Sequence, residues 1–250
     1  MDSVTEQRGL AGVHLERFLK LIEPKLKSDS EADDGAYTNM IESTSVKEEP
    51  FGRPSMETGF HALLPEKWVL HFHSLAAVLM AHEYQKDPEG VARWLLGLGA
   101  PEVVFVEPLM PGLLLCREVS RHPQIPVFVL QNHGIILQGS DPKSVLEEWE
   151  RLEVKFCAKW YPSVRRGNRS FGVGTIPLKI YFPDSAVFFE RMQRLAKNPT
   201  LQDQDASELW EATALLHSCC PELPELPLSL SAQVSNLPSE LYRQQVGGEV

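Results

Sequence analysis

Two histidines, His71 and His73, lie two residues apart in the apolar run WVLHFH (68–73), which is rich in strand-forming residues. Alternation along a strand places both imidazoles on one face, roughly 6.5–7 Å apart, so that they can bind one cation from the same side. Taken alone, this spacing is also typical of histidines that pack in a core or lie at a surface. A metal site at this position therefore requires further ligands.

Two more residues complete a possible ligand set. His133 stands in QNHG, after an apolar run that ends at Gln131 and before Gly134, which permits a tight turn. Glu57, in PSMETGFHALLP, lies fourteen residues before His71, close enough for a helix or turn to fold back onto the strand. Three neutral nitrogens and one carboxylate suit a divalent metal with an exchangeable position, most simply Zn²⁺.

Other histidines and the cysteines have simpler interpretations. His61 lies four residues after Glu57 and either orients it, contacts substrate or packs beside the site. His82, in the predicted helix LAAVLMAHEY, is interpreted as an ordinary helix residue. The four cysteines lack C-x-x-C spacing, and we interpret them as reduced thiols, including the neighbours Cys219 and Cys220.

The elements around the histidines alternate between strands and helices. VVFV (103–106) and PVFVLQ (126–131) are predicted to be further buried strands, with PGLLLCREVSRH (111–122) as a helix between them. Ser74 is expected to cap the helix after His73. A second cap at Ser140 or Asp141 precedes the clearest helix, with one apolar stripe of Val145, Trp149, Leu152, Phe156 and Trp160. Helices therefore cover the sheet on one or both faces in an α/β layered domain.

The flanking regions differ from this core in composition. Residues 10–26 predict an amphipathic helix that ends at Pro24, and 27–50 is polar enough to predict a loop or linker. After residue 160, IPLKIYF predicts a strand, followed by helices near 185–197 and 203–218. We expect three parts: residues 1–50 as an N-terminal helix and polar linker, 51–160 as the core, and 161–250 as an extension that packs on the core.

Charge and hydropathy restrict the partners. The formal net charge is −10 and the pI about 5.3, which excludes a general attraction to nucleic-acid phosphates or anionic lipid, so a phosphorylated ligand must be held by local donors. No apolar run approaches the roughly 18 residues of a membrane span, and the first residues do not resemble a signal peptide. We expect a cytoplasmic protein without nucleic-acid or membrane partners.

Four segments resemble a known family. PSMETGFHALLP, VLHFHSLAAVLMAH, MPGLLLCREV and FVLQNHGIILQG, in this order, are similar to the core of the class II aldolase/adducin family over roughly residues 50–160. IYFPDSAVFF and SELYRQQV resemble the C-terminal extension of its rhamnulose-phosphate-aldolase-like branch. The resemblance implies a three-layer α/β/α subunit with a central, mostly antiparallel sheet, and a homotetramer with sites near subunit interfaces.

The resemblance also implies a chemistry. In the family, the carboxylate of S-x-E and the histidines of H-x-H and N-H-G surround zinc. The residues that match these motifs here are Glu57, His71, His73 and His133. This implies a metal-dependent lyase that cleaves or forms a carbon–carbon bond in a ketose phosphate through a metal-stabilised enediolate, with Glu57 as general base or displaceable ligand. An epimerase or dehydratase of the same superfamily, or a non-catalytic adducin-like module, is the alternative. Adducin-like members typically lack these ligands, so their retention favours an enzyme.

Substrate contacts are less complete. Ser55 is carried over from the family motif as a phosphate contact, while Arg53 and His61 are our own additions. The N-x-S segment and Ser-Gly turn that bind phosphate in the family are absent before Pro50. Either other residues hold the phosphate, or the substrate has none, or the chain keeps the metal without turnover.

Overall fold

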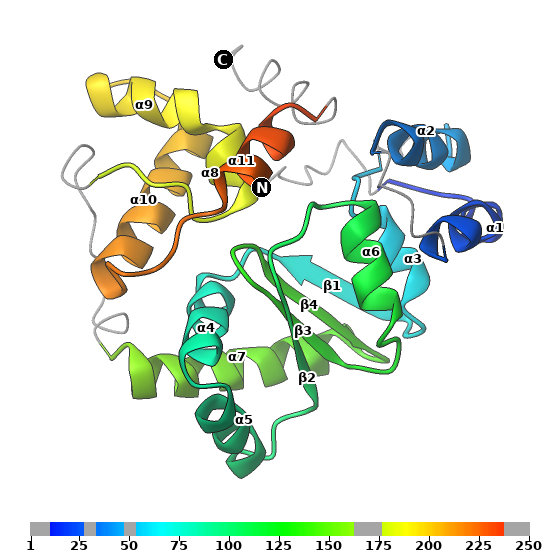
Figure 1. Cartoon of the computed structure of the whole chain (residues 1–250), viewed down its shortest axis with the longest axis horizontal. Coiled ribbons are helices and arrows are strands. Elements are labelled where there is room, and N and C mark those ends of the chain that lie inside the picture. Colours follow the sequence, from blue (N-terminus) through cyan, green and yellow to red (C-terminus); the bar gives the residue numbers. More distant parts are fainter. Residues whose placement is uncertain (1–10, 28–33, 48–53, 163–176, 238–250) are drawn as a thin grey trace.

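The computed structural model describes residues 11–27, 34–47, 54–162 and 177–237, shown in colour in Figure 1. A central sheet lies between helices, and the helices after residue 180 form a separate group at one side of it (Figure 1). The helices of these residues are, in chain order, α1 (Leu15–Leu26), α2 (Asp34–Thr44), α3 (Thr58–Leu63), α4 (Leu75–Lys86), α5 (Pro88–Gly97), α6 (Leu113–Ser120), α7 (Pro142–Trp160), α8 (Pro183–Val187), α9 (Phe189–Lys197), α10 (Gln204–Cys219) and α11 (Leu228–Ser235).

The sheet has four strands: β1 (Trp68–Phe72), β2 (Val103–Val106), β3 (Val127–Leu130) and β4 (Gly134–Gly139). Their spatial order is β1-β4-β3-β2, in which β4 pairs antiparallel with both β1 and β3 while β2 pairs parallel with β3. The predicted fold class, an α/β domain with a mostly antiparallel central sheet, is confirmed. β4 was not predicted as a strand, yet it joins the strand that carries His71 to the rest of the sheet.

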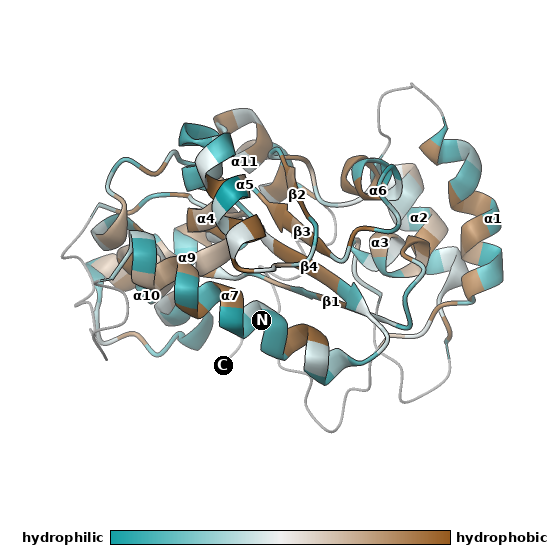
Figure 2. Cartoon of the chain, turned by 90° about the horizontal axis from the view of Figure 1, so that it is seen from below, coloured by the Kyte–Doolittle hydropathy of each residue, from teal (hydrophilic) through white to brown (hydrophobic). Residues whose placement is uncertain are grey.

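Different apolar clusters cover the two faces of the sheet. One, here called the first-face cluster, joins Phe128, Leu130 and Ile136 to buried residues of α1, α2, α3, α6, α8 and α11. The other, the second-face cluster, joins Val127, Val129, Ile135 and Leu137 to α4, α5, α7 and the end of α10. Alternate residues of each strand therefore face opposite layers. In Figure 2 the strands β2, β3 and β4 are largely brown, whereas α7 alternates between teal and brown along its length.

Predicted helix starts are confirmed beside the sheet. The Ser74 side chain caps α4 by accepting a hydrogen bond from Ala77 N. The Asp141 side chain caps α7 by accepting from Ser144 N, and the stripe on α7 is buried through Trp149, Leu152 and Phe156. The sequence signals of cap and stripe thus fix where these helices begin and which side packs inward.

Helix α2 lies within residues 27–50, where a loop was predicted. Tyr37 and Ile41, four residues apart, are each only 2% exposed and belong to the first-face cluster. Burial of these two side chains on one helical face stabilises α2 despite its polar neighbours. Helix α1 also continues two residues beyond Pro24, since the fully buried Phe18 and Ile22 hold it against the core.

The prediction of a strand at IPLKIYF is wrong for residues 177–182, the part of this segment that the structure describes. These residues pair with no strand. The backbone N–H groups of Tyr181 and Phe182 both donate to Ser185 Oγ at 3.1 Å, and Leu226 N donates to the Ile180 carbonyl at 2.7 Å. These bonds satisfy the backbone without a ladder. The helices predicted near 185–197 and 203–218 are confirmed as α8, α9 and α10.

No helix in the described parts of the chain combines the length and apolar character needed to cross a bilayer. The division of the chain at residues 50 and 160 stays a prediction.

Candidate metal centre

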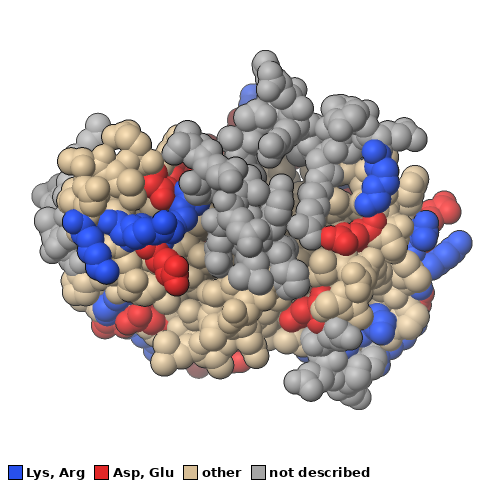
Figure 3. All heavy atoms as spheres, turned by 90° about the horizontal axis from the view of Figure 1, so that it is seen from above, with Lys and Arg blue, Asp and Glu red and all other residues tan. Residues whose placement is uncertain are grey.

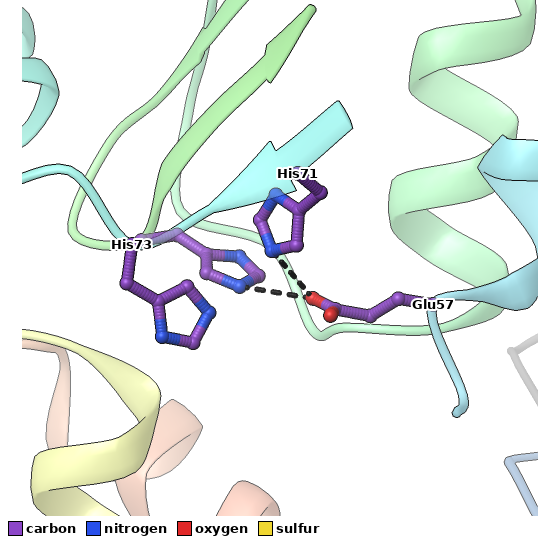
Figure 4. A group of neighbouring side chains, drawn as sticks. Glu57, His71 and His73 are labelled. Carbon is purple, nitrogen blue, oxygen red and sulfur yellow. Dashed lines mark ion pairs between the residues drawn. The ribbon is translucent and has the colours of Figure 1, made fainter. Parts of the chain in front are cut away.

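The structure brings together the four residues predicted as metal ligands. Glu57, His71, His73 and His133 each offer one ligand atom, and these atoms lie within 4.8 Å of one another. Figure 4 shows His71 pointing toward Glu57, with His73 beside them. We call this group the sheet centre, because His71 lies in β1, His73 directly follows β1, and His133 lies in the turn between β3 and β4.

The pairing of β1 sets the positions of the first two histidines. His71 lies opposite Ile136 of β4 and faces the same layer as Val69, which packs on the first-face cluster. His73 comes directly after the last residue of β1. The two ring centroids are 5.2 Å apart. A shift of one residue in this pairing would turn both imidazoles to the opposite face.

The turn before β4 brings in the third histidine. Asn132 has a left-handed φ of 54°, and its amide donates to the carbonyls of Tyr181 and Pro224 at 3.0 and 3.1 Å. A Cβ at Gly134 would lie 2.4 Å from the Phe72 carbonyl oxygen, so only glycine allows the turn to approach β1 this closely. His133 is thereby placed with its ring centroid 5.0 Å from that of His71.

Glu57 reaches the histidines from the N-cap position, immediately before α3. Its backbone N–H donates to Ser55 Oγ at 3.0 Å, and the Ser55 carbonyl accepts from Thr58 N, also at 3.0 Å. Its Oε1 lies 3.1 Å from His71 Nε2 and 3.0 Å from His133 Nε2. One carboxylate oxygen therefore sits between two imidazole nitrogens.

Hydrogen bonds on the other ring nitrogen orient two of the imidazoles. His71 Nδ1 donates to the Ile135 carbonyl at 2.8 Å, and His73 Nδ1 donates to Asp184 Oδ2 at 2.6 Å. Each bond leaves Nε2 with a lone pair for a cation when the ring is neutral, and a carboxylate behind a histidine raises its basicity as a ligand. Asp184 was not predicted; the only signal was one acidic residue inside the apolar stretch IYFPDSAVFF.

The charges within the centre are strongly coupled. Burial disfavours the charged carboxylate, yet the imidazoles of His71 and His133 outweigh it and hold the pKa of Glu57 well below its ordinary value. Burial likewise lowers the pKa of His71, but the Glu57 charge outweighs it and raises this pKa overall. Burial lowers the pKa of His133 to about 4, so that ring is neutral at pH 7.

The residues fit a divalent cation. His71 Nε2 is buried and makes no hydrogen bond, although Glu57 Oε1 lies 3.1 Å away. Bonds of about 2.1 Å in a tetrahedron place neighbouring ligand atoms about 3.4 Å apart, close to the 3.0 and 3.1 Å found here. Three imidazoles and a carboxylate match the donor chemistry of Zn²⁺ and related ions.

The predicted substrate contacts lie around this centre with different surroundings. Ser55 is exposed and its hydroxyl oxygen accepts from Glu57 N. His61 is exposed, stacks on Phe60 with ring centroids 4.7 Å apart, and is not among the clustered ligands. Arg53 lies outside the described residues. Their roles toward substrate stay predictions.

Comparison with known proteins agrees with the fold. The model of the family described as "Class II Aldolase and Adducin N-terminal domain" matches residues 22–160. A solved N-terminal class II aldolase domain of a conserved protein from Thermoplasma acidophilum is 23% identical, with a TM-score of 0.48. That match covers 58% of this chain and 64% of the other, so this chain spans less than two thirds of its length. No curated protein matches the chain.

Proposed function

The chain belongs to the class II aldolase and adducin N-terminal domain family, and from this we propose that it is a zinc-dependent lyase acting on a ketose phosphate. The reaction is cleavage or formation of the carbon–carbon bond next to the ketone. The observation that supports this most is the convergence of three imidazoles and one carboxylate within 4.8 Å. Two of those imidazoles are already oriented by bonds to Ile135 and Asp184.

His71, His73 and His133 would hold the cation, which supplies positive charge that stabilises an oxyanion beside the breaking bond. Access to the centre favours Glu57 as the proton carrier. The side chains of His71 and His133 are 6% exposed, whereas that of Glu57 is 20% exposed and that of His73 is 28% exposed. Substrate therefore approaches on the side of Glu57 and His73. Glu57 Oε2, the oxygen further from the imidazoles, is placed to accept or return the proton.

A phosphate on the substrate needs local donors. On the face shown in Figure 3, one group of Lys and Arg side chains lies at the left, bordered by Asp and Glu side chains, and other basic side chains are scattered at the right. Ser55 is exposed two residues before Glu57, which supports it as a phosphate contact, and we propose Arg53 and His61 as further contacts. These donors stand in for the N-x-S segment that is absent before Pro50.

We also propose the rhamnulose-phosphate-aldolase-like branch and a homotetramer. The support for the branch is that IYFPDSAVFF, one of the segments that resemble it, supplies Asp184 to His73 at 2.6 Å. The C-terminal segment thus belongs to the working centre. In this branch, as the resemblance implies, a neighbouring subunit would complete the surroundings of the substrate.

Turnover of a substrate panel tests the proposal. Metal-loaded protein is incubated with ketose 1-phosphates, and dihydroxyacetone phosphate is detected with a coupled glycerol-phosphate dehydrogenase. We expect dihydroxyacetone phosphate to be released, and a chelator to stop the release. The variant His71→Ala/His73→Ala should release none and should contain one ion per chain fewer, because it has lost two ligands at once. If metal-loaded protein cleaves none of these compounds, and also fails on unphosphorylated ketoses, the lyase proposal is wrong.

A further inference from the structure

A second group of possible metal ligands lies away from the sheet centre. His82 of α4, Cys220 at the end of α10 and Glu222 in the following turn each offer a ligand atom, and these atoms lie within 4.8 Å of one another. We call them the helix-end cluster. From the sequence we interpreted His82 as an ordinary helix residue and Cys220 as a reduced thiol. The two residues are 138 positions apart in the chain, and nothing in the sequence indicates that they lie together.

His82 has an unsatisfied nitrogen. The residue is 8% exposed, and its Nε2 is buried without a hydrogen-bond partner. Buried side-chain nitrogens nearly always have a partner, so one without a partner indicates an ordered water or a cation that completes the surroundings. A thiol and a carboxylate within reach favour the cation, because a neutral imidazole, a thiolate and a carboxylate are all ligands of Zn²⁺.

A tight turn places the other two ligands on the same side. Cys220 N donates to the Leu216 carbonyl at 2.8 Å, which ends α10, and Leu223 N donates to the Cys220 carbonyl at 3.0 Å. Leu216 and Leu223 are both buried in the second-face cluster and hold this turn against α4. Cys220 is 1% exposed, whereas the Glu222 side chain is 62% exposed. The cluster is therefore closed toward the protein and open toward solvent at Glu222.

The surrounding charges suit one divalent ion. Lys86 Nζ lies 3.2 Å from Glu83 and 3.8 Å from Glu222, and the Tyr161 hydroxyl donates to Glu83 at 2.6 Å. With Cys220 as thiolate, three negative groups and one positive group leave two negative charges, which one divalent cation neutralises. Burial raises the pKa of the Cys220 thiol to about 11, so binding of the ion releases the thiol proton to solvent.

We propose that His82, Cys220 and Glu222 form a second divalent-metal site that fastens the turn after α10 to α4. Its thiolate selects Zn²⁺ over Mg²⁺, Ca²⁺ or Mn²⁺, since soft ligands disfavour those hard cations. A water or another small ligand occupies the fourth position on the open side. The site is independent of the sheet centre and of the reaction proposed for it, because the two groups share no ligand.

Cobalt titration of metal-free, reduced full-length protein tests the site. Co²⁺ bound by a thiolate gives a near-ultraviolet charge-transfer absorption that Co²⁺ bound by imidazole and carboxylate lacks. We expect this absorption to saturate at one equivalent per chain in His71→Ala/His73→Ala, and by two equivalents in the wild type, whose sheet centre also takes up an ion. It should be absent in Cys220→Ser and unchanged in the matched variant Cys219→Ser. Zn²⁺ should displace it, and Mg²⁺ should not.

Two outcomes overturn the proposal: no thiolate absorption in the wild type at two equivalents of Co²⁺ per chain, or an absorption that Cys220→Ser retains. Because a buried substitution can disturb folding, Glu222→Gln serves as a second variant at an exposed position. It should fold as the wild type and weaken Co²⁺ at this site by at least about tenfold, as loss of one of three ligands predicts. Unchanged affinity in folded Glu222→Gln removes that residue from the site and contradicts the proposal.

Discussion

The sheet centre and the helix-end cluster gather similar side chains by different means. In the sheet centre, strand pairing and one close backbone approach at Gly134 bring three imidazoles to centroid distances of 4.9 to 5.2 Å. In the helix-end cluster, the ligands are not joined by hydrogen bonds between strands. Apolar packing of the turn after α10 on α4 brings them together. Backbone hydrogen bonds therefore fix the first geometry, whereas docking of the C-terminal helices fixes the second.

The two groups also differ in which ligand meets solvent. In the sheet centre the more accessible members are Glu57 and His73, and both stay mostly buried. In the helix-end cluster the accessible member is Glu222, on the turn after α10. A preformed, sheltered arrangement suits catalysis, because donors that need no rearrangement stabilise a transition state most. An arrangement closed by docking suits attachment of one part of the chain to another.

The largest expected effect separates the two carboxylates. Glu57→Gln keeps the size of the side chain and removes the base, so we expect turnover to fall by roughly 10²–10⁴ while metal content stays within about twofold of wild type, since three histidines remain. Glu222→Gln is the matched substitution and should leave turnover unchanged. The measurements are steady-state kinetics and elemental analysis on both variants.

Full turnover in Glu57→Gln would remove Glu57 from the mechanism. If Glu57→Gln is inactive only because it has lost its metal, Glu57 is a structural ligand. Glu57 and Glu222 would then have the same role, each in its own site. His61→Ala is a further comparison, and a residue that packs beside the site should weaken metal binding and turnover partially and by similar factors.

A smaller effect is expected at Asp184, the contribution of the C-terminal helices to the sheet centre. Asp184→Asn keeps the shape but weakens the bond at 2.6 Å that orients His73, so metal affinity at the sheet centre should fall by roughly 10–100-fold. Competition with a chromophoric chelator measures it. Glu190→Gln, at an exposed position on α9, is the control and should bind as the wild type. Equal affinity in both variants would mean that strand pairing alone orients His73.

The smallest expected effect concerns α2. Tyr37 Oη donates to the Met56 carbonyl at 3.0 Å and lies 3.3 Å from Cys116 Sγ, beside the turn that carries Glu57. Tyr37→Phe should lower the free energy of unfolding by about 1 kcal/mol, the usual contribution of a buried hydrogen bond, and reduce turnover more than metal binding. Denaturant unfolding and kinetics measure the two.

Tyr181→Phe is the matched control, because its hydroxyl contacts His217 at 3.2 Å on the side of α10. It should share the loss of stability without the loss of turnover. Equal turnover in the two variants would show that α2 stabilises the fold without positioning Glu57.

Local signals in the sequence sufficed for much of the sheet and for the four ligands. His71 and His73 alternate with apolar residues on one strand, and QNHG marks a strand end. Together with Glu57 and the resemblance to a known family, these features predicted a shared ion. Caps at Ser74 and Asp141 located two helices. These features depend on neighbours within a few positions, which a single sequence displays.

Contacts between distant segments were not predictable in this way. Asp184 lies 111 positions after His73, and His82 lies 138 positions before Cys220. Helix α2 depends on burial of Tyr37 by other segments. Residues 177–182 pair with no strand, and Ser185 Oγ accepts the backbone hydrogen bond of Tyr181 instead. Tertiary packing decided each of these outcomes over local propensity.

The close approach of Gly134 to β1 also has a consequence for the order in which the protein matures. During synthesis Glu57, His71 and His73 emerge first, but β4, the strand that pairs with β1, follows more than 60 positions later, and Asp184 later still. Until then the chain offers one carboxylate and two imidazoles without the strand that positions them. Non-local pairing of this kind forms late, because the entropy cost of closing the loop comes before the contacts that offset it. The four candidate ligands of the sheet centre therefore come together only in a chain that has finished folding.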